Sequence, residues 1–452
     1  MKALRSFSLG VLASLVLFAL PLVAGATPPP VAEATSTFEY TQNMHPLGFS
    51  PREIPLANAE PGAGSFNSDL AFWGNTAVQG TYAGFRLIDI SSPARPREII
   101  NWEECNSRTN SQGNQGDIVI WGDILVRSWN SPAPSGGSMC GDMPVAPGEE
   151  GVHIIDISDP TNPDVIAFVD LPCGSHTDTG VPDLANDRLI LYSNPSGGAC
   201  PQVDIVEVPL SDPANPTYHG PLLSGRPCHD TGVILGDAMK MACAGGNGVT
   251  AWTLDPADGA SLLNPIQLFS RSLGVGIGHS AVWTWDGEVL IFGHEPGGGG
   301  QAQCQATSSE LNRTLFFLDG ETGDTVGTLL HPRPQTNTEN CTWHNYNVVP
   351  TDKRYVLVSG NYQSGISVVD FTDPANAEEI AYADPAPLVN PDNPAALELG
   401  GDWSTYWYNG RIYESDITRG MLIWDLSDPA VAGAQKLAHL NPQTQEFTID
   451  LK

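Results

Sequence analysis

The feature that most constrains the fold of this chain is a short motif that returns along it. Its best copies share a glycine, an apolar run, an aspartate and a Ser/Thr-Ser/Asp-Pro ending. These copies begin at Gly84, Gly151, Gly365 and Gly420, a drifted copy spans 203–216, and two weaker copies span 248–256 and 313–319. Each β-rich run ends where proline follows, because proline fixes the turn angle and cannot continue a central strand. Self-similarity at this period indicates a repeat architecture.

A second pattern, strand–turn–strand, precedes each copy of the motif. The units start near Asp69, Asp117, Asp178, Asp230, Ser280, Asn345 and Ser404, with spacings of 48, 61, 52, 50, 65 and 59 residues. Each unit therefore has room for a hairpin, the motif strand and a fourth strand, and four-stranded units arranged radially are propeller blades. We predict an all-β fold, a seven-bladed β-propeller of four-stranded antiparallel blades. A pair of β-sandwiches is the alternative, but it does not predict seven equivalent units.

At these motif residues the chain resembles the LVIVD-repeat family of secreted β-propeller proteins. The resemblance covers roughly residues 65–440 and rests on the five better copies of the motif. It implies a propeller fold and brings no established chemistry.

The beginning of the chain has the layout of a secretory signal peptide. Lys2 and Arg5 precede an apolar run over 7–20, and Ala24-Gly25-Ala26 forms a small-residue cleavage site. We therefore expect a signal peptide over 1–26, an N-terminal extension over 27–60 and the propeller over 61–452. Residues 38–56 or 444–451 are expected to complete a terminal blade by strand addition. The mature chain should be a monomer without a membrane span, and either secreted or at the cell surface.

The charge of the chain narrows the classes of partner. The formal net charge is −31, so phosphate backbones are repelled and nucleic acid is excluded as a partner. The 47 glycines and 38 prolines suit short strands and turns better than helices. An extracellular protein, a glycan or a small molecule remains as the expected ligand.

The eight cysteines are predicted to form four disulfides between sequence neighbours. The pairs are Cys105–Cys140, Cys173–Cys200, Cys228–Cys243 and Cys304–Cys341, and each pair is centred on a predicted turn. A disulfide across a hairpin needs partners about equally far from the turn. The alternative, metal ligation, lacks a Cys-x-x-Cys pair, and an exported chain meets oxidising conditions.

Histidines recur at the start of the predicted inner strands, which line the channel of a propeller. His229, His279 and His344 hold equivalent positions in three consecutive units, and His176 lies one residue before that position. The same end of the channel collects Asp69, Asp117, Asp178, Asp230 and Trp403. Neutral imidazoles are common ligands of transition metals. The set predicts one Zn, Cu or Fe ion held by these four histidines, with Asp178 and Asp230 in the outer shell.

Two alternatives stand beside the metal hypothesis. The polar residues could simply bond neighbouring blades to one another, and strict strand alternation would turn His176 to another face unless a bulge intervenes. Long loops over 130–150 and 294–312 gather at the same mouth. His294 and Glu295 either reach the mouth or form a solvated pair on the second loop.

No motif for a reaction is present: the sequence has neither a Gly-x-Ser-x-Gly elbow nor a His-Glu-x-x-His pair nor a dinucleotide fingerprint. The sequence therefore favours an extracellular binding protein that uses the loop-rich, histidine-bearing channel mouth. A metal-dependent enzyme with a histidine-ligated ion at the centre of the propeller is the alternative.

Overall fold

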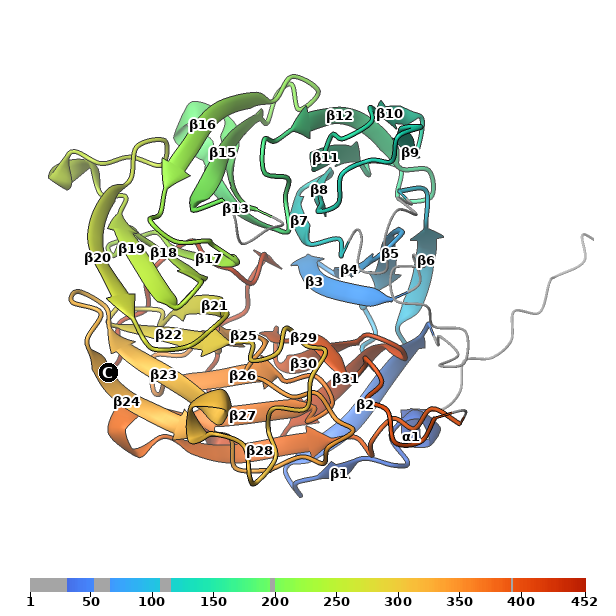
Figure 1. Cartoon of the computed structure of the whole chain (residues 1–452), viewed down its shortest axis with the longest axis vertical. Coiled ribbons are helices and arrows are strands. Elements are labelled where there is room, and N and C mark those ends of the chain that lie inside the picture. Colours follow the sequence, from blue (N-terminus) through green and yellow to red (C-terminus); the bar gives the residue numbers. More distant parts are fainter. Residues whose placement is uncertain (1–30, 53–65, 106–114, 196–199, 392) are drawn as a thin grey trace, which may run out of the picture.

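The computed structural model describes residues 31–52, 66–105, 115–195, 200–391 and 393–452. The predicted signal peptide lies outside these residues. The described chain forms seven antiparallel blades around a central channel, which confirms the predicted propeller (Figure 1). The first strands of neighbouring blades contact one another around the whole ring. The first strand of every blade is therefore the inner strand.

The strands follow the chain in order. Blade one consists of β3 (Asn67–Trp73), β4 (Thr76–Thr81), β5 (Gly84–Asp89) and β6 (Arg97–Trp102). Blade two consists of β7 (Ile118–Trp121), β8 (Ile124–Trp129), β11 (Gly151–Asp156) and β12 (Asp164–Asp170). Blade three consists of β13 (Thr177–Asp183), β14 (Arg188–Asn194), β15 (Gln202–Pro209) and β16 (Thr217–Leu223). Blade four consists of β17 (Asp230–Ile234), β18 (Lys240–Gly245), β19 (Gly248–Thr253) and β20 (Ile266–Ser272).

Blades five to seven continue the pattern. Blade five consists of β21 (Gly278–Trp283), β22 (Val289–His294), β23 (Thr314–Asp319) and β24 (Thr325–Leu330). Blade six consists of β25 (Asn345–Val348), β26 (Val356–Gly360), β27 (Ile366–Asp370) and β28 (Glu378–Asp384). Blade seven begins with β29 (Asp402–Tyr408), β30 (Arg411–Asp416) and β31 (Gly420–Leu426). The fourth strand of blade seven is β2 (Met44–Pro51), which pairs antiparallel with β31. A strand from near the N-terminus thus closes the ring beside the C-terminal blade (Figure 1).

The repeated motif forms the third strand of a blade, and its residues have physical roles there. Asp89, Asp156 and Asp370 end their strands, and each side chain accepts the backbone N–H two residues further on, at 2.8–3.0 Å. The glycine that opens the motif allows the fourth strand to pass closely. A Cβ at Gly84 would lie 1.9 Å from the carbonyl oxygen of Trp102, so any side chain there would displace the strand.

Three smaller elements extend the blades. The short helix α1 (Val31–Ala34) precedes β1 (Glu39–Tyr40), which adds an outer strand to blade six beside β28. The hairpin β9 (Ser138–Cys140) and β10 (Met143–Val145) lies within the long connection of blade two. Among the described residues, no helix has the length and apolar character needed to cross a membrane.

The C-terminal segment crosses the end of the channel where the inner strands finish. Within it, β32 (His439–Leu440) pairs with β3, and β33 (Thr444–Gln445) pairs in parallel with β17. Between and beside these strands, the Asn441 side chain bonds the backbone of Ile120 in both directions, and Gln445 bonds the carbonyl of Trp283 at 2.7 Å. The Thr444 hydroxyl donates to the carbonyl of Gly180 at 2.8 Å. The segment thus contacts the inner strands of the first five blades at this end of the channel. The predicted histidines lie at the other end, which the segment does not cover.

All four predicted disulfides are confirmed. Three of them straddle the turn between the first and second strands of a blade, and Cys304–Cys341 straddles the turn between β23 and β24. Three of the four also hold a cysteine one to three residues before a histidine of the channel mouth, in the order Cys173 and His176, Cys228 and His229, Cys341 and His344. The disulfides therefore fix the segments that carry these histidines.

Candidate metal centre and ligand cavity at the channel mouth

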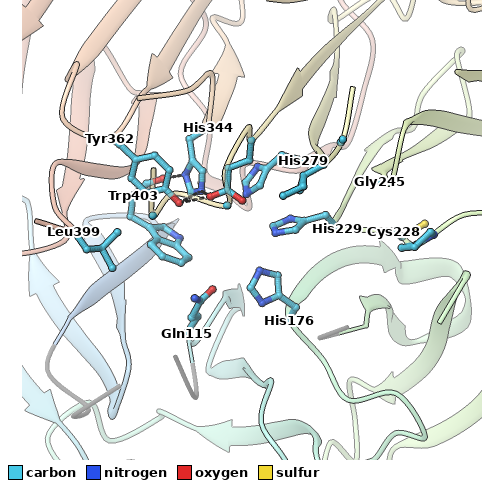
Figure 2. Close-up of a pocket in the computed structure, with 18 of the residues that line it drawn as sticks. Gln115, His176, Cys228, His229, Gly245, His279, His344, Tyr362, Leu399 and Trp403 are labelled. Atoms are coloured by element: carbon cyan, nitrogen blue, oxygen red, sulfur yellow. Dashed lines mark hydrogen bonds and ion pairs between the residues drawn. The ribbon is translucent and has the colours of Figure 1, made fainter. Parts of the chain in front are cut away.

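The four histidines predicted from the sequence lie in one row at the channel mouth (Figure 2). The ring centroids of His176 and His229 are 4.4 Å apart, those of His229 and His279 are 3.9 Å apart, and those of His279 and His344 are 4.2 Å apart. His279 and His344 are buried, whereas His176 and His229 are half-buried. Four consecutive blades therefore each contribute one imidazole to a continuous surface.

The backbone places His176, His229 and His344 at equivalent positions of their blades, so the offset of His176 in the sequence pattern does not persist in the structure. The N–H groups of His176, His229 and His344 donate to the carbonyls of Asn194, Ala244 and Gly360. In each case, that carbonyl belongs to the residue that pairs with the residue after the histidine. Two consecutive residues thus face one partner residue, as in a β-bulge. Blade five has a register shift between Gly278 and Ala281, where His279 lies.

Burial keeps these imidazoles neutral at ordinary pH. It lowers the pKa of His176 to about 4 and that of His344 to about 3. It also lowers the pKa values of His229 and His279 well below the usual value, and the neighbouring imidazoles add to this effect. A neutral imidazole offers an unprotonated nitrogen, which is the form that binds a metal ion.

A carboxyl group joins two of these histidines in one set of potential ligand atoms. One potential ligand atom from each of His229, His279 and Glu295 lies within 4.8 Å of the others. Glu295 follows β22 and is 7% exposed, so the expectation of a solvated loop pair is wrong. Burial raises the pKa of Glu295 to about 7. His294 is also buried, but it does not line the cavity, and its ring lies 6.2 Å from that of Phe316.

The ring nitrogens differ in their hydrogen bonds. His344 uses both: Nδ1 donates to the carbonyl of Trp403, and Nε2 lies 2.9 Å from the hydroxyl of Tyr362. The Nδ1 atom of His176 accepts from the Asn130 amide at 2.8 Å, since that amide nitrogen can only donate. The Nδ1 atom of His229, by contrast, is buried and has no hydrogen-bond partner among the residues that the structure describes.

The Tyr362 hydroxyl links His344 to Glu295. It lies 2.6 Å from Oε1 of Glu295 as well as 2.9 Å from Nε2 of His344. Because Nδ1 of His344 donates to a carbonyl, a neutral ring has Nε2 as an acceptor. Tyr362 has one hydroxyl hydrogen for two acceptors, so a protonated Glu295 satisfies the set when no ion is bound. The raised pKa of Glu295 agrees with this arrangement.

The predicted aspartates lie deeper and mostly connect blades. The Asp117 carboxylate accepts the backbone N–H of Asp178 at 2.6 Å, and Asp69 accepts the Tyr406 hydroxyl at 2.7 Å. Asp178 itself accepts the Ser175 hydroxyl and bonds none of the four histidines. Asp230 lies 3.8 Å from Nδ1 of His279 and 3.2 Å from the hydroxyl of Ser280, which bonds the same Nδ1 at 2.7 Å. Among these aspartates, Asp230 is the one placed to orient a mouth histidine.

A cavity of about 820 Å³ opens above the row of histidines. Its lining also includes the predicted Trp403 and several residues that the sequence did not indicate (Figure 2). These include Tyr82, Gln115, Tyr362, Leu397 and Leu399. Tyr82 and Tyr362 lie in the turns before the motif glycines Gly84 and Gly365, so an aromatic residue at that point of two repeats was a signal for them.

The comparisons with known proteins match one repeat of the chain to a family and leave its function open. Residues 145–170, which include β11 and β12, match the LVIVD repeat family. No curated protein matches the chain significantly. Among solved structures, the β-propeller domain of Myceliophteria thermophila Cps50 (Swd1) is similar, with 10% identity, a TM-score of 0.48, and coverage of 80% of this chain and 98% of that one. A chain of a mitotic checkpoint complex has 13% identity, a TM-score of 0.47, and coverage of 92% and 99%.

The protein is thus a seven-bladed β-propeller that carries an LVIVD repeat. Its function has to be inferred from the residues of the channel mouth.

Proposed function

We propose that this protein is an exported, small-molecule-binding propeller that holds one transition-metal ion at its channel mouth. The observation that carries the proposal is the set formed by His229, His279 and Glu295, whose donor atoms lie within 4.8 Å of one another at the base of a cavity. Ligand atoms about 2.0–2.2 Å from one ion lie roughly 3–3.5 Å apart, so donors already within 4.8 Å of one another need only small side-chain movements to share an ion.

The donor set fits a Zn, Cu or Fe ion. The imidazoles are neutral, Nδ1 of His229 is buried without a partner, and Glu295 becomes a charged oxygen ligand when its proton leaves. Two imidazoles and one carboxylate leave coordination positions open. His176 and His344 flank the set and are the further ligands expected from the sequence. A bound ion would act as a Lewis acid toward a donor atom of a ligand in the cavity.

The protein residues around this set would orient it and receive the ligand. Asp230 and Ser280 hold the ring of His279, and Tyr362 holds Glu295. Such outer-shell partners fix the orientation and the tautomer of metal ligands. The four disulfides support an oxidising location, in line with the predicted export. The concave cavity of about 820 Å³ at the mouth favours a small molecule over a protein or glycan as the ligand.

Metal content tests the proposal directly. Protein purified without a nickel column should contain about one equivalent of a transition metal by elemental analysis. The variants His229→Ala and His279→Ala should lose most of it, whereas His439→Gln, at the opposite end of the channel, should retain it. Metal-free wild-type protein that also fails to take up Zn, Cu or Fe in a titration would contradict the proposal. The histidines would then serve only to bond neighbouring blades.

A further inference from the structure

The mouth cavity has two chemically different sides. The row of four imidazoles forms one side, and Trp403 and Leu399 lie on the other, where the Trp403 ring meets the end of the row 5.3 Å from that of His344 (Figure 2). Trp403 is 9% exposed, and its ring meets that of Tyr82 edge-on at 6.0 Å. Leu399 packs against the same aromatic cluster. A molecule that enters the cavity therefore meets polar nitrogens on one side and apolar carbon on the other.

The charges around the cavity are not those of a site for anions. Among the described residues that line it, none is lysine or arginine, while Glu295 and Glu398 are acidic. The whole chain also has a formal net charge of −31. A carboxylate or phosphate group would thus lose its hydration without gaining a cationic partner from these side chains.

Both carboxyl groups of the cavity already have partners, which disfavours an organic cation. Oε1 of Glu295 bonds the Tyr362 hydroxyl, and Oε1 of Glu398 accepts from the Asn390 amide at 2.7 Å. An uncharged ligand has neither problem.

We propose that the cavity takes an uncharged organic molecule with an apolar or aromatic body and one donor group. The body lies against Trp403 and Leu399, and the donor group, such as a hydroxyl or carbonyl, faces the imidazoles. The volume of about 820 Å³ is in the range of cavities that enclose small organic ligands. This inference rests on the cavity of the proposed function but not on its metal ion.

Three probes of one size and different charge test the inference. Binding of 1-naphthalenemethanol, 1-naphthoate and 1-naphthylmethylammonium is measured by calorimetry on chelator-treated wild-type protein. We expect the alcohol to bind at least about tenfold more tightly than either ion. Equal or tighter binding of the carboxylate or the ammonium probe, or no binding of the alcohol, would overturn the inference. Because these measurements use metal-free protein, their outcome is separate from that of the metal analysis.

Two variants place the probe in the cavity. Trp403→Ala should weaken binding of the alcohol by about tenfold, because the aromatic face is lost. Trp121→Ala, at the far end of an inner strand, should leave it unchanged. Leu399→Asp should weaken binding of the alcohol and strengthen binding of the ammonium probe. Leu223→Asp, on an exposed outer strand, should leave the affinity for both probes unchanged. If Trp403→Ala does not fold, as judged by circular dichroism, the Leu399 pair decides. Alcohol affinity that is unaffected by Leu399→Asp would overturn the inference.

Discussion

Removal of the Cys228–Cys243 disulfide should affect both stability and metal binding. The pair closes 15 residues, and the chain-entropy relation gives a stabilisation of about 3 kcal/mol for a loop of that length. Cys228 also lies directly before His229 and lines the cavity. Without the disulfide, the segment before His229 gains freedom, so ordering the metal site costs more free energy.

The double variant Cys228→Ala/Cys243→Ala is compared with Cys105→Ala/Cys140→Ala. The second pair closes 35 residues and has no mouth histidine beside it, and the same relation gives about 4 kcal/mol. Urea unfolding should therefore show a slightly larger loss for the control, while competition with a chelator should show weaker metal binding for the Cys228 variant alone. Equal metal affinity of the two variants would refute the idea that the disulfides position the histidines.

Two further predictions concern stability. Burial, together with the charge of Asp416, raises the pKa of Glu414 to about 7. The folded state therefore keeps a proton there that the unfolded chain has released, and this stabilisation disappears as the pH rises through about 7. The melting temperature of the wild type should fall between about pH 5 and 8, and Glu414→Gln should flatten that fall; an unchanged slope contradicts the assignment. Deletion of residues 439–452 should lower the free energy of unfolding in urea by about 3–5 kcal/mol, because the bonds to Ile120, Gly180 and Trp283 are lost. A decrease below about 1 kcal/mol would show that the segment does not brace the channel.

The propeller could be predicted because the residues that end its strands act locally in the sequence. In three copies of the motif, an aspartate whose side chain accepts the backbone N–H two residues on, together with a following proline, ends a strand at a defined residue. The cysteine pairs could be predicted for a related reason, since partners equally far from a turn meet across it. The position of the four histidines followed from the same repeat.

The composition of the site was harder to predict, because it depends on loops and on local register. Glu295 joins His229 and His279 because β22 ends at its neighbour His294, which pairs with Gly278 beside His279. The sequence gives Glu295 only as a residue at the start of a long loop. Tyr362 and Leu399 come from irregular connections whose paths no periodicity specifies. Similarly, His176 joins the row because the paired part of β13 begins at Thr177 rather than at Asp178, which the sequence pattern did not show.

Anomalous X-ray diffraction from crystals of the metal-loaded protein is the most direct test of the proposed centre. Data collected above and below the absorption edge of the metal found by elemental analysis locate the ion without reference to the protein coordinates. The proposal predicts one peak at the channel mouth, about 2.0–2.2 Å from His229, His279 and Glu295, with an open side toward the cavity. A peak elsewhere in the protein, or no peak in metal-soaked crystals, would contradict it.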